Sequence, residues 1–553
     1  MCGIFGYFGT QSQPQTLLEA FQNIQPRGPD FTTLEQVGEG QWLGFHRLAI
    51  MDPTPAGNQP FYLDGMMLVC NGEIYNHEAL AEEYDLTLTS GSDCEVILHL
   101  YQRLGIEKTV RALDGVFAFI IVDGDQSFIA RDPIGIRPLF LGTKTGDAGD
   151  VDIAVCSEMK GVHDLVDIVS QFPPGHWARI DSGVVSVHEY YEYAYPEMTE
   201  NDETYLMALI RDGLTAAVDK RMMSDRPLGC LVSGGVDSSL VAALVARHYE
   251  VGELHTFTVG LKMGASDRGY ARMVADHIGS IHHEVLLTKK EALALLEETV
   301  RVCETWDTTT IRASSMQLAL SRYISEHTDI KVVFNGDVID EASGSYVYFK
   351  NAPSPEAYQE ETIRLMKEIH LFDVLRTDRT ISGSGLEARL PFGDLEFLRM
   401  YMSISPQLRQ PREGVEKYLL RKAFDGYLPD AVLWRPKEAF SDGCSQPEES
   451  WSTIIESFVD GLVSDDTFEQ AQYAHGMPKT KEQLYYRSLF ERHYPGRATV
   501  IPHYWMPRWC GDAVVDPSAR VLTDVYRASS ETLVGRRGDW VSKGSKKAKK
   551  RTG

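Results

Sequence analysis

Short apolar runs separated by glycine, proline and aspartate dominate the first 190 residues of the chain. Runs of about four to eight β-branched, aromatic and aliphatic residues bounded by turn formers are typical of β-strands. The pattern predicts strands over residues 3–8, 42–51, 66–70, 116–122, 128–131, 151–157 and 184–190. We therefore expect a sheet-rich N-terminal domain.

The spacing of apolar residues changes after an acidic, aromatic stretch that contains Pro196. A helical period over 203–221 places five apolar residues on one face: Leu206, Leu209, Ile210, Ala217 and Val218. Beyond it the pattern predicts strands at 229–232, 254–259 and 331–334 and helices at 240–247, 270–278 and 290–303. This alternation indicates a parallel sheet flanked by helices, and residues 352–491 are mostly helical in pattern.

These patterns divide the chain into five parts. They are a first domain (2–190), a linker (191–202), a second domain (203–491), a C-terminal extension (492–535) and a basic tail (536–553). The tail is rich in lysine and almost free of large apolar residues, so we expect it to be solvated and disordered.

Composition and charge fit a soluble multidomain enzyme. A chain of 553 residues is too long for one packed core, and 43% apolar with 24% charged residues suits ordinary globular domains. The net charge is −25, and the first 200 residues hold 29 acidic against 10 basic side chains. A field of that sign repels phosphate backbones and anionic lipid, so neither nucleic acid nor a membrane is an expected partner of the folded body. The first basic residue is Arg27 and no apolar run approaches the ~20 residues of a membrane span, so we expect a cytoplasmic protein.

Eight cysteines are spread singly, without a CxxC pair or a spacing suited to zinc or a disulfide framework. Cys2 differs from the others because it follows the initiator Met1. If Met1 is removed, which the small side chain at position 2 permits, Cys2 carries both a thiol and a free α-amine. That amine has an ordinary pKa near ~7.7–8.0, so it can take the thiol proton near neutral pH. On its own, Cys2 could equally be a thiol that merely starts a strand.

Seven short segments follow Cys2 in a specific order. They are Cys2-Gly-Ile-Phe-Gly6, Arg27-Gly-Pro-Asp30, His46-Arg-Leu48, Asn71-Gly-Glu-Ile-Tyr-Asn76, Gly91-Ser-Asp-Cys-Glu95, Leu113-Asp-Gly-Val-Phe-Ala-Phe119 and Arg131-Asp-Pro-Ile-Gly135. In this order they resemble the glutaminase domain of class II glutamine amidotransferases, an N-terminal-nucleophile hydrolase. The resemblance implies an αββα sandwich that hydrolyses glutamine.

The resemblance also assigns roles to particular residues. Cys2 would be the nucleophile, and the Asn71 side chain with the Gly72 backbone N–H would form the oxyanion hole. Arg47 would pair with the glutamine α-carboxylate, because a planar fork of donors suits that group, and Glu73 and Asp93 would face its α-amine. Taken singly, Arg47 and Asp93 could also form a surface ion pair.

The segment Leu231-Val-Ser-Gly-Gly-Val-Asp-Ser-Ser239 follows a short apolar strand and leads into a helix. Small residues let backbone N–H groups point inward and the helix N-terminus adds partial positive charge, so the segment is a candidate phosphate site. It lacks the Gly-Lys-Ser/Thr ending of the usual nucleoside-triphosphatase loop, so a lysine must come from elsewhere. Asp237 beside two hydroxyls suggests a Mg²⁺ ligand next to a pyrophosphate.

This segment is similar to that of the ATP-pyrophosphatase group, and its fusion to a glutaminase resembles the glutamine-hydrolysing asparagine synthetases. Such a chain combines an α+β unit, the sandwich, with an α/β unit, a parallel-sheet domain with helical elaboration. Further matching segments are Thr258-Val-Gly260, Asp307-Thr-Thr-Thr-Ile-Arg-Ala-Ser314, Gly385-Leu-Glu-Ala-Arg-Leu-Pro-Phe392 and Arg435-Pro-Lys-Glu-Ala-Phe-Ser-Asp-Gly443.

The resemblance implies that ATP activates the aspartate side-chain carboxylate as an acyl-adenylate, which ammonia then attacks. The implied catalytic residues here are Asp337 and Lys437, and Asp237 with Asp340 would hold Mg²⁺. The implied ATP-binding residues are Leu231, Ser233, Gly234, Gly235, Asp237, Ser238, Ser239, Val259, Asn335, Gly336 and Arg312. Glutamine, aspartate and ATP would be the substrates, and the family pattern implies a homodimer.

One segment departs from the family pattern. The family has Ser-Gly-Glu-Gly-Ser/Ala-Asp-Glu where this chain has Asn335-Gly-Asp-Val-Ile-Asp-Glu341. Asp337 keeps the carboxylate but shortens its reach by one methylene. Val338 in place of glycine is harder to accommodate, because a β-branched residue does not readily adopt positive φ. Downstream, Ser343-Gly-Ser345 and Gly393 also replace family residues. We expect a working adenylation site with altered geometry or rate.

Two other functions fit the same architecture. One is amidotransfer to another carboxylate or an intramolecular ring closure, against which Cys2 argues because that relative often lacks a working N-terminal cysteine. The other is a catalytically silent homologue, for which the altered 335–341 loop is the only support.

Overall fold

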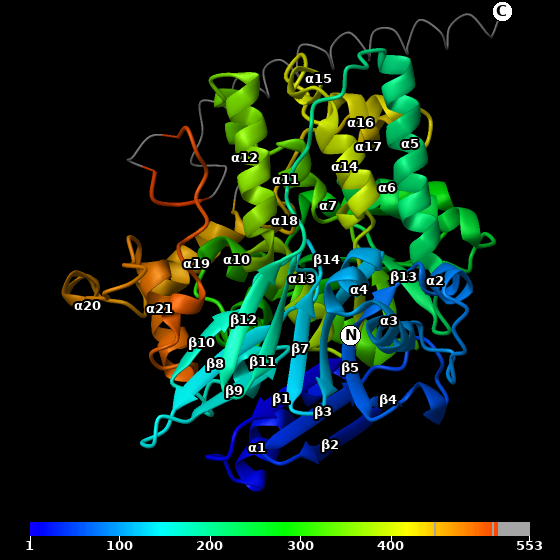
Figure 1. The fold of residues 1–553 in the computed structure, drawn as a ribbon. Coiled ribbons are helices and arrows are strands. Elements are labelled where there is room, and N and C mark those ends of the chain that lie inside the picture. The colour runs from blue at the N-terminus through cyan, green and yellow to red at the C-terminus, as the bar shows by residue number, and fades with distance from the viewer. Residues whose placement is uncertain (447–448, 511–513, 518–553) are drawn as a thin grey trace, which may run out of the picture.

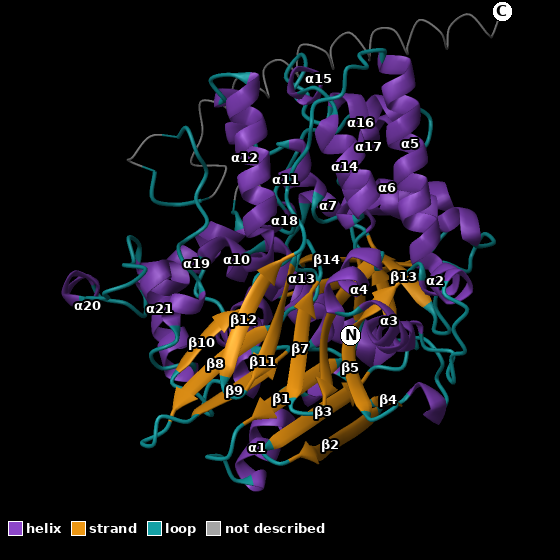
Figure 2. Ribbon diagram, in the orientation of Figure 1, coloured by secondary structure: helices purple, strands orange, loops and turns teal. Residues whose placement is uncertain are grey.

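The structure is a computed structural model that describes residues 1–446, 449–510 and 514–517. Two sheet-bearing units build it, with the N-terminal strands at one end and the helix-rich remainder at the other (Figures 1 and 2). Within the described residues, none of the helices combines the length and apolar character that a membrane crossing requires. The predicted basic tail, 536–553, lies outside the described residues.

Two six-stranded antiparallel sheets form the N-terminal unit. Their strand orders are β10-β8-β9-β1-β3-β2 and β12-β11-β7-β6-β5-β4. The strands are β1 (Gly3–Phe8), β2 (Phe31–Gly38), β3 (Gln41–Arg47), β4 (Phe61–Leu63), β5 (Met66–Ile74), β6 (Gly115–Asp123), β7 (Gln126–Arg131), β8 (Phe140–Thr145), β9 (Val151–Cys156), β10 (Ile168–Gln171), β11 (His176–Asp181) and β12 (Val184–Glu189).

Side chains that alternate along the central strands build the layers of this unit. Ile4 of β1 shares an apolar cluster between the two sheets with Ile120 of β6. Phe5, the next residue of β1, packs on the other face in the cluster that contains helix α1, and Phe119 of β6 packs with helix α3. The outer helices are α1 (Pro14–Gln22), α2 (His77–Glu83), α3 (Val96–Leu104) and α4 (Ile106–Ala112). The predicted αββα sandwich is confirmed.

A five-stranded parallel sheet in the order β15-β14-β13-β16-β17 forms the second unit. The strands are β13 (Leu228–Leu231), β14 (His255–Leu261), β15 (Ile281–Leu287), β16 (Val332–Phe334) and β17 (Glu387–Arg389). Helices α5, α6 and α7 pack on one face, and helices α9 and α10 pack on the other. The strand order reverses between β13 and β16, and in open α/β sheets ligands bind outside the carboxyl ends of the strands at such a point.

The helices of this unit account for most of the remaining chain. They are α5 (Glu203–Asp219), α6 (Val236–Val245), α7 (Ser266–Ile278), α8 (Lys289–Ala294), α9 (Leu296–Cys303), α10 (Thr308–His327), α11 (Ile339–Ser343), α12 (Pro355–Glu368), α13 (Asp373–Ser382), α14 (Leu395–Ser403), α15 (Pro406–Arg409), α16 (Tyr418–Ala423), α17 (Asp430–Leu433), α18 (Phe440–Gly443), α19 (Trp451–Asp460), α20 (Asp465–Gln470) and α21 (Lys481–His493).

Two predicted features of the second unit are wrong in detail. The single helix over 290–303 is two helices, α8 and α9, which meet at Leu295. Strand β17 lies inside the region predicted to be mostly helical. Its two end residues, Glu387 and Arg389, are charged and buried, so no apolar alternation marks the strand; parallel pairing with β16 and buried ion pairs hold it in place.

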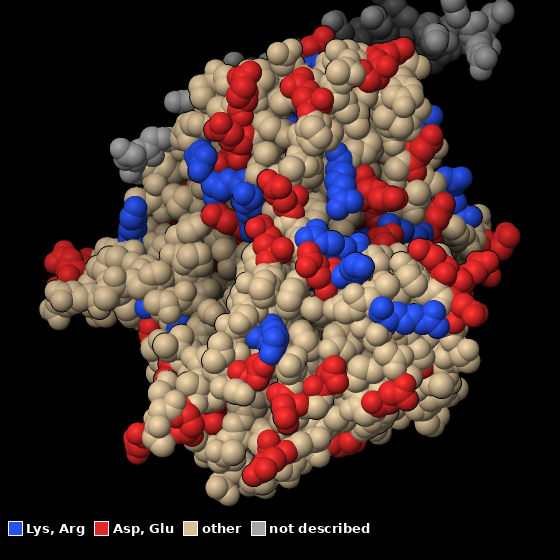
Figure 3. Space-filling model, viewed as in Figure 1, with Lys and Arg blue, Asp and Glu red and all other residues tan. Residues whose placement is uncertain are grey.

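The two units share a core and differ in surface charge. One apolar cluster contains Phe140 and Val162 of the first unit together with Leu296, Ile381 and Tyr494 of the second. On the face in Figure 3, acidic side chains are spread over the N-terminal sheets and basic ones gather towards the junction. The acidic N-terminal bias of the sequence is therefore a surface property of the sandwich.

Candidate active sites

Cys2 lies directly before β1, and both its carbonyl and its thiol contact neighbours. The thiol donates to the Leu48 carbonyl at 3.7 Å, and the Cys2 carbonyl accepts from Arg27 Nε at 2.9 Å. Burial raises the pKa of this thiol to about 11, so a base must take its proton before it can attack. The α-ammonium of Met1 donates to the Leu386 carbonyl at 3.2 Å, and burial lowers the pKa of this amine to about 6. An amine buried at this end of the chain is therefore largely neutral at pH 7.

Asn71 and Gly72 lie in β5, in the sheet that faces β1. The Asn71 side chain is fully buried, and neither its oxygen nor its nitrogen has a hydrogen-bond partner within the part of the chain that the structure describes. A buried amide without partners costs free energy, so a ligand is its natural partner. A Cβ on Gly72 would lie 2.5 Å from the Val116 carbonyl oxygen, so only glycine fits there.

The predicted glutamine-binding carboxylates are buried. Asp93 accepts from the Ile74 backbone N–H at 2.6 Å, and Glu73 lies 3.4 Å from Arg389 of the second unit. Burial raises the pKa of both carboxyls, and for Glu73 the nearby charge of Glu387 adds to the effect. Burial therefore disfavours the anionic form of both groups, for Glu73 even with the Arg389 guanidinium nearby.

Arg47 contacts the loop that follows it in the sequence. Its guanidinium donates to the Thr54 carbonyl at 2.8 Å, to Asn58 Oδ1 at 2.7 Å and to the carbonyls of Met51 and Asp52. The arginine thus holds the loop over residues 51–58. Its contact with the glutamine α-carboxylate stays a prediction.

Arg27 connects the two units. Its guanidinium donates to Glu158 at 2.5 Å, to both carboxylate oxygens of Asp378 in α13 at 2.8 and 3.0 Å, and to Ser382 at 2.9 Å. Burial alone would raise the pKa of Asp378, but the charge of Arg27 lowers it to about 2. The main chain of Cys2 is therefore oriented by an arginine that the second unit holds in place.

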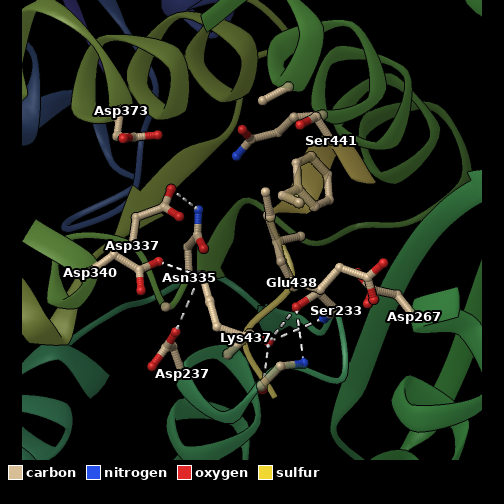
Figure 4. A pocket seen from close by; sticks show the side chains of 18 of the residues that line it. Ser233, Asp237, Asp267, Asn335, Asp337, Asp340, Asp373, Lys437, Glu438 and Ser441 are labelled. Carbon is tan, nitrogen blue, oxygen red and sulfur yellow. Dashed lines mark hydrogen bonds and ion pairs between the residues drawn. The ribbon is translucent and has the colours of Figure 1, made fainter. Parts of the chain in front are cut away.

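The main pocket of the second unit opens at the carboxyl ends of β13, β14 and β16 (Figure 4). The predicted residues that line it are Leu231, Ser233, Gly235, Asp237, Ser238, Val259, Asn335, Gly336, Asp337, Asp340 and Lys437. The topology thus brings together segments that are more than 200 residues apart in the sequence.

The Gly-rich turn before α6 is shaped by its own hydroxyls. The Ser233 backbone N–H donates to Ser238 Oγ at 3.1 Å, and the Gly235 N–H donates to Ser233 Oγ at 3.2 Å. Gly234 has φ +78°, and a Cβ there would lie 2.5 Å from Tyr270 Cβ in α7. Gly234 and Ser239 stand outside the pocket lining; Ser239 donates instead to the Gly235 carbonyl at 2.6 Å.

Two lysines and two aspartates form a charged cluster at the base of the pocket. Lys417 bridges Asp237 at 2.6 Å and Asp340 at 2.5 Å, and Lys437 contacts the other oxygen of Asp340. Burial alone would raise the pKa of Asp340, but the two ammonium groups lower it far below its usual range. The buried Oδ1 of Asp237 has no hydrogen-bond partner among the described residues. A free carboxylate oxygen beside a second carboxylate is the donor chemistry that Mg²⁺ takes, so the pair fits this ion.

The loop over residues 335–341, which differs from the family pattern, contains strained backbone at Val338. Val338 has φ +87° and ψ −36° and is buried. Gly336 approaches the Gly-rich turn so closely that a Cβ on it would lie 2.4 Å from the Ser238 nitrogen. Asp337 accepts from Asn335 at 2.7 Å and from Thr377 of α13.

Arg312 does not line the main pocket. It forms buried ion pairs with Glu482 at 2.6 Å and Asp516 at 2.8 Å, so its donors are taken by carboxylates. Its contact with phosphate stays a prediction.

Sequence reasoning missed several residues of the pocket. Phe257 could have been found, because it precedes Val259 by two positions in a predicted strand and so shares its face. Lys417, Asp373 and Arg376 lie in helical regions whose patterns give no signal of a site. Trp505 belongs to the C-terminal extension and reaches the pocket through the tertiary fold alone.

Two family models match the chain. A model described as a glutamine amidotransferase domain matches residues 1–170, and a model described as asparagine synthase matches residues 209–360 and 350–510. Together they cover both units.

Full-length relatives are similar over nearly the whole chain. Curated proteins named asparagine synthetase (glutamine-hydrolyzing) are 42% identical over 567 residues in Cricetulus griseus, 43% over 570 in Gallus gallus and 41% over 561 in Homo sapiens. These alignments cover 96%, 96% and 95% of this chain and 100%, 100% and 99% of the respective relatives.

Proposed function

The chain belongs to the family of glutamine-hydrolysing asparagine synthetases, and from this premise we propose how its residues divide the reaction. The first unit releases ammonia from glutamine. The second uses ATP to activate the aspartate side chain and transfers the ammonia to it, giving asparagine, AMP and pyrophosphate.

We propose that Cys2 acts once Met1 has been removed. The α-amine of Cys2 takes the thiol proton, and the thiolate attacks the side-chain carbonyl carbon of glutamine. The C–N bond breaks as ammonia leaves, and water then cleaves the thioester to glutamate. The thiol pKa of about 11 supports this order, because such a thiol needs a base of its own.

The oxyanion of each tetrahedral intermediate would be bound by the Asn71 side chain and the Gly72 N–H. The buried, unpartnered Asn71 amide supports this role, since a donor fixed before the reaction has no reorganisation to undergo. Glu73 and Asp93 would face the glutamine α-amine, whose positive charge would lower their raised pKa values.

In the second unit, Leu231 and Val259 would contact the adenine, and Ser233, Gly235 and Ser238 would bind phosphate at the N-terminus of α6. An oxygen of the aspartate side chain attacks the α-phosphorus and pyrophosphate leaves. Lys437 is the lysine that the Gly-rich turn lacks, and it would neutralise charge on the leaving group.

Asp237 and Asp340 would hold Mg²⁺, which when bound supplies positive charge to the phosphate oxygens. Asp337 would accept the proton that ammonia loses after it attacks the acyl carbon, because its carboxylate lines the same pocket. AMP is the leaving group of that step.

The observation that carries this proposal is that one chain holds two features together. The buried Asn71 amide, without a partner among the described residues, lies in the sheet that faces the strand directly after Cys2, and a lysine–aspartate cluster lies beside the Gly-rich turn. A silent homologue would have no reason to keep both. The homodimer and the cytoplasmic location stay predictions.

The test follows nitrogen from glutamine. Glutamine labelled on its amide nitrogen is supplied with ATP, Mg²⁺ and aspartate, and the products are read by mass spectrometry. Label in asparagine is the expected result. Label that appears only as free ammonia would indicate another acceptor or an inactive second site, and unconsumed glutamine would indicate a silent protein.

A further inference from the structure

The carboxylate of Asp337 is one methylene shorter than the glutamate of the family pattern, and it accepts hydrogen bonds from Asn335, which also departs from that pattern, and from Thr377. We propose that Asn335 and Thr377 are positioning residues that orient Asp337 for the attack of ammonia on the acyl-adenylate. This inference rests on the proposed function.

The contacts of Asp337 leave one oxygen for the reaction. Asn335 Nδ2 donates to Oδ2 of Asp337 at 2.7 Å, and the Thr377 hydroxyl donates to the same oxygen. The other oxygen, Oδ1, lies 3.2 Å from Arg376. Two neutral donors occupy Oδ2, whereas Oδ1 has one ion pair, with Arg376, so Oδ1 keeps a lone pair that can accept a proton from the substrate side.

Arg376 is held in turn, so it does not compete with Asn335 and Thr377 for the positioning role. Its guanidinium donates to Gln317 at 2.6 Å and to Asp373 at 3.0 Å. The Arg376 guanidinium is therefore shared among Gln317, Asp373 and Asp337. The two neutral donors to Oδ2, from Asn335 and Thr377, fix the rotation of the Asp337 carboxylate.

Asn335 and Thr377 stand on rigid backbone. Asn335 follows β16 directly, and its N–H donates to the Arg389 carbonyl at 2.9 Å in the extension of the sheet. Thr377 is buried in α13, and its hydroxyl would lose its hydrogen bond without Asp337. A buried hydroxyl that loses its hydrogen-bond partner is destabilising, so Thr377 and Asp337 are best explained as a matched pair.

Figure 4 shows the same relation from inside the pocket. Asp337 and Asn335 point toward one another, with their hydrogen bond drawn between them, and the Lys437 amine points toward Asp340 and Asp237. A serine at position 335 is too short for a contact of this kind.

The test removes the Thr377 hydroxyl without changing its shape. Thr377→Val is expected to lower kcat for ammonia-dependent asparagine synthesis by about 10–100-fold, the scale expected for a carboxylate displaced by up to about 1 Å. The KM for ATP and the rate of ATP–pyrophosphate exchange with aspartate should change by less than about three-fold, because adenylation precedes the step that needs Asp337. Thr377→Ser should restore most of kcat.

Thr380→Val is the matched control. Thr380 is a buried threonine of the same helix, and its hydroxyl donates to the Arg376 carbonyl at 2.9 Å and not to Asp337. It should keep kcat within about three-fold of the native value. Asn335→Ala should lower kcat for ammonia-dependent synthesis in the same range, because it removes the other donor to Oδ2 of Asp337.

The outcomes separate this inference from the proposed function. If the native enzyme is active but Thr377→Val keeps its kcat, or if Thr377→Val and Thr380→Val lose synthesis and exchange alike, the positioning role is wrong. A native enzyme that makes no asparagine from ammonia would overturn the proposed function and this inference together.

Discussion

The two active sites of this chain differ in how they are held. The glutaminase site keeps every family segment, and its buried polar groups are braced from the other domain by Asp378 on Arg27 and by Arg389 on Glu73. The synthetase site has four changed residues in its acidic loop, and two of them, Asn335 and Asp337, contact one another, while Asp337 also contacts Thr377 of α13. A site braced by a second domain leaves little freedom to change, whereas a loop whose contacts lie within one domain can change in matched groups.

The electrostatics of the two sites differ as well. Burial raises the pKa values of Cys2, Glu73 and Asp93, so the glutaminase groups favour their neutral forms without substrate. Around Asp340 two lysines reverse the effect of burial and keep the carboxylate charged. The groups of the glutaminase site are thus neutral until a charged substrate binds, whereas those of the synthetase site already form ion pairs without substrate.

The largest effect should come from Cys2→Ala. It should lower glutamine-dependent asparagine synthesis by at least about 10⁴-fold, because no other group can form the thioester, and it should leave ammonia-dependent synthesis intact. Steady-state assays with each nitrogen source measure the split. Cys510→Ala, a partly exposed cysteine of the other unit, is the control. Glutamine use that survives in Cys2→Ala would mean that the nucleophile lies elsewhere.

Lys437→Met should give the opposite pattern. It should lower synthesis from either nitrogen source by about 10²–10³-fold, because a cation at the leaving group is lost, while glutamine hydrolysis continues. Release of glutamate measures the glutaminase reaction, and release of pyrophosphate measures the synthetase reaction. Lys422→Met, which removes an exposed ion pair with Asp425, should change neither. Equal loss of both halves would show that the lysine serves the fold and not the chemistry.

Asp378→Asn tests the brace between the domains. It should lower kcat/KM for glutamine by about ten-fold, because Arg27 loses its charged partner and Cys2 its fixed carbonyl, with a smaller effect on ammonia-dependent synthesis. Asp425→Asn, at an exposed ion pair, controls for loss of charge alone. A larger loss of ammonia-dependent than of glutamine-dependent synthesis would contradict the role of Asp378 in supporting the glutaminase site.

The same ion pair predicts a pH effect. The pKa of Asp378 is lowered to about 2, so the pair stabilises the fold fully above the ordinary carboxyl pKa near ~4 and loses that contribution as pH falls towards 2. The stability gap between the native protein and Asp378→Asn, read from urea unfolding, should therefore be constant from pH 8 to 5 and narrow below about pH 4. If the difference in the free energy of unfolding grew as the pH fell, the stabilising role of the Asp378 anion would be contradicted.

The smallest effect should come from the rebuilt loop. Val338 has a positive φ, and a Cβ on Gly393 would lie 3.6 Å from Val338 Cγ2, an ordinary contact, but 2.9 Å from Ile136 Cδ1, which is too close. Val338→Gly should relieve backbone strain but lose packing, for a net change in the free energy of unfolding within about 1 kcal/mol. Gly393→Ala should destabilise by about 1 kcal/mol through its contact with Ile136, so the two changes should be additive in a double-mutant cycle. Coupling between positions 338 and 393 would show that Val338, and not Ile136, limits the space at Gly393.

Much of the fold could be predicted from the sequence pattern, but several elements could not. Apolar runs predict β1, β3, β5, β6, β7, β9 and β12 of the first unit and β13, β14 and β16 of the second, whereas β2, β4, β8, β10, β11 and β15 are not among the predicted strands. Strand β17 escaped detection because Glu387 and Arg389 are buried through ion pairs, which leave no apolar period. Helices α8 and α9 were read as one because the break at Leu295 carries neither glycine nor proline.

The sequence alone determined those parts of the chemistry that depend on local backbone: a thiol at the second position, an Asn-Gly pair in a strand, and a Gly-rich turn that leads into a helix. The tertiary structure alone decided the partners of the charged residues. Arg47 holds its own loop, Arg312 pairs with Glu482, and Lys417 bridges Asp237 and Asp340. The physical reason is the high cost of an unpaired buried charge: such a group takes whichever opposite charge the fold brings within reach, and that reach is not written in the neighbouring sequence.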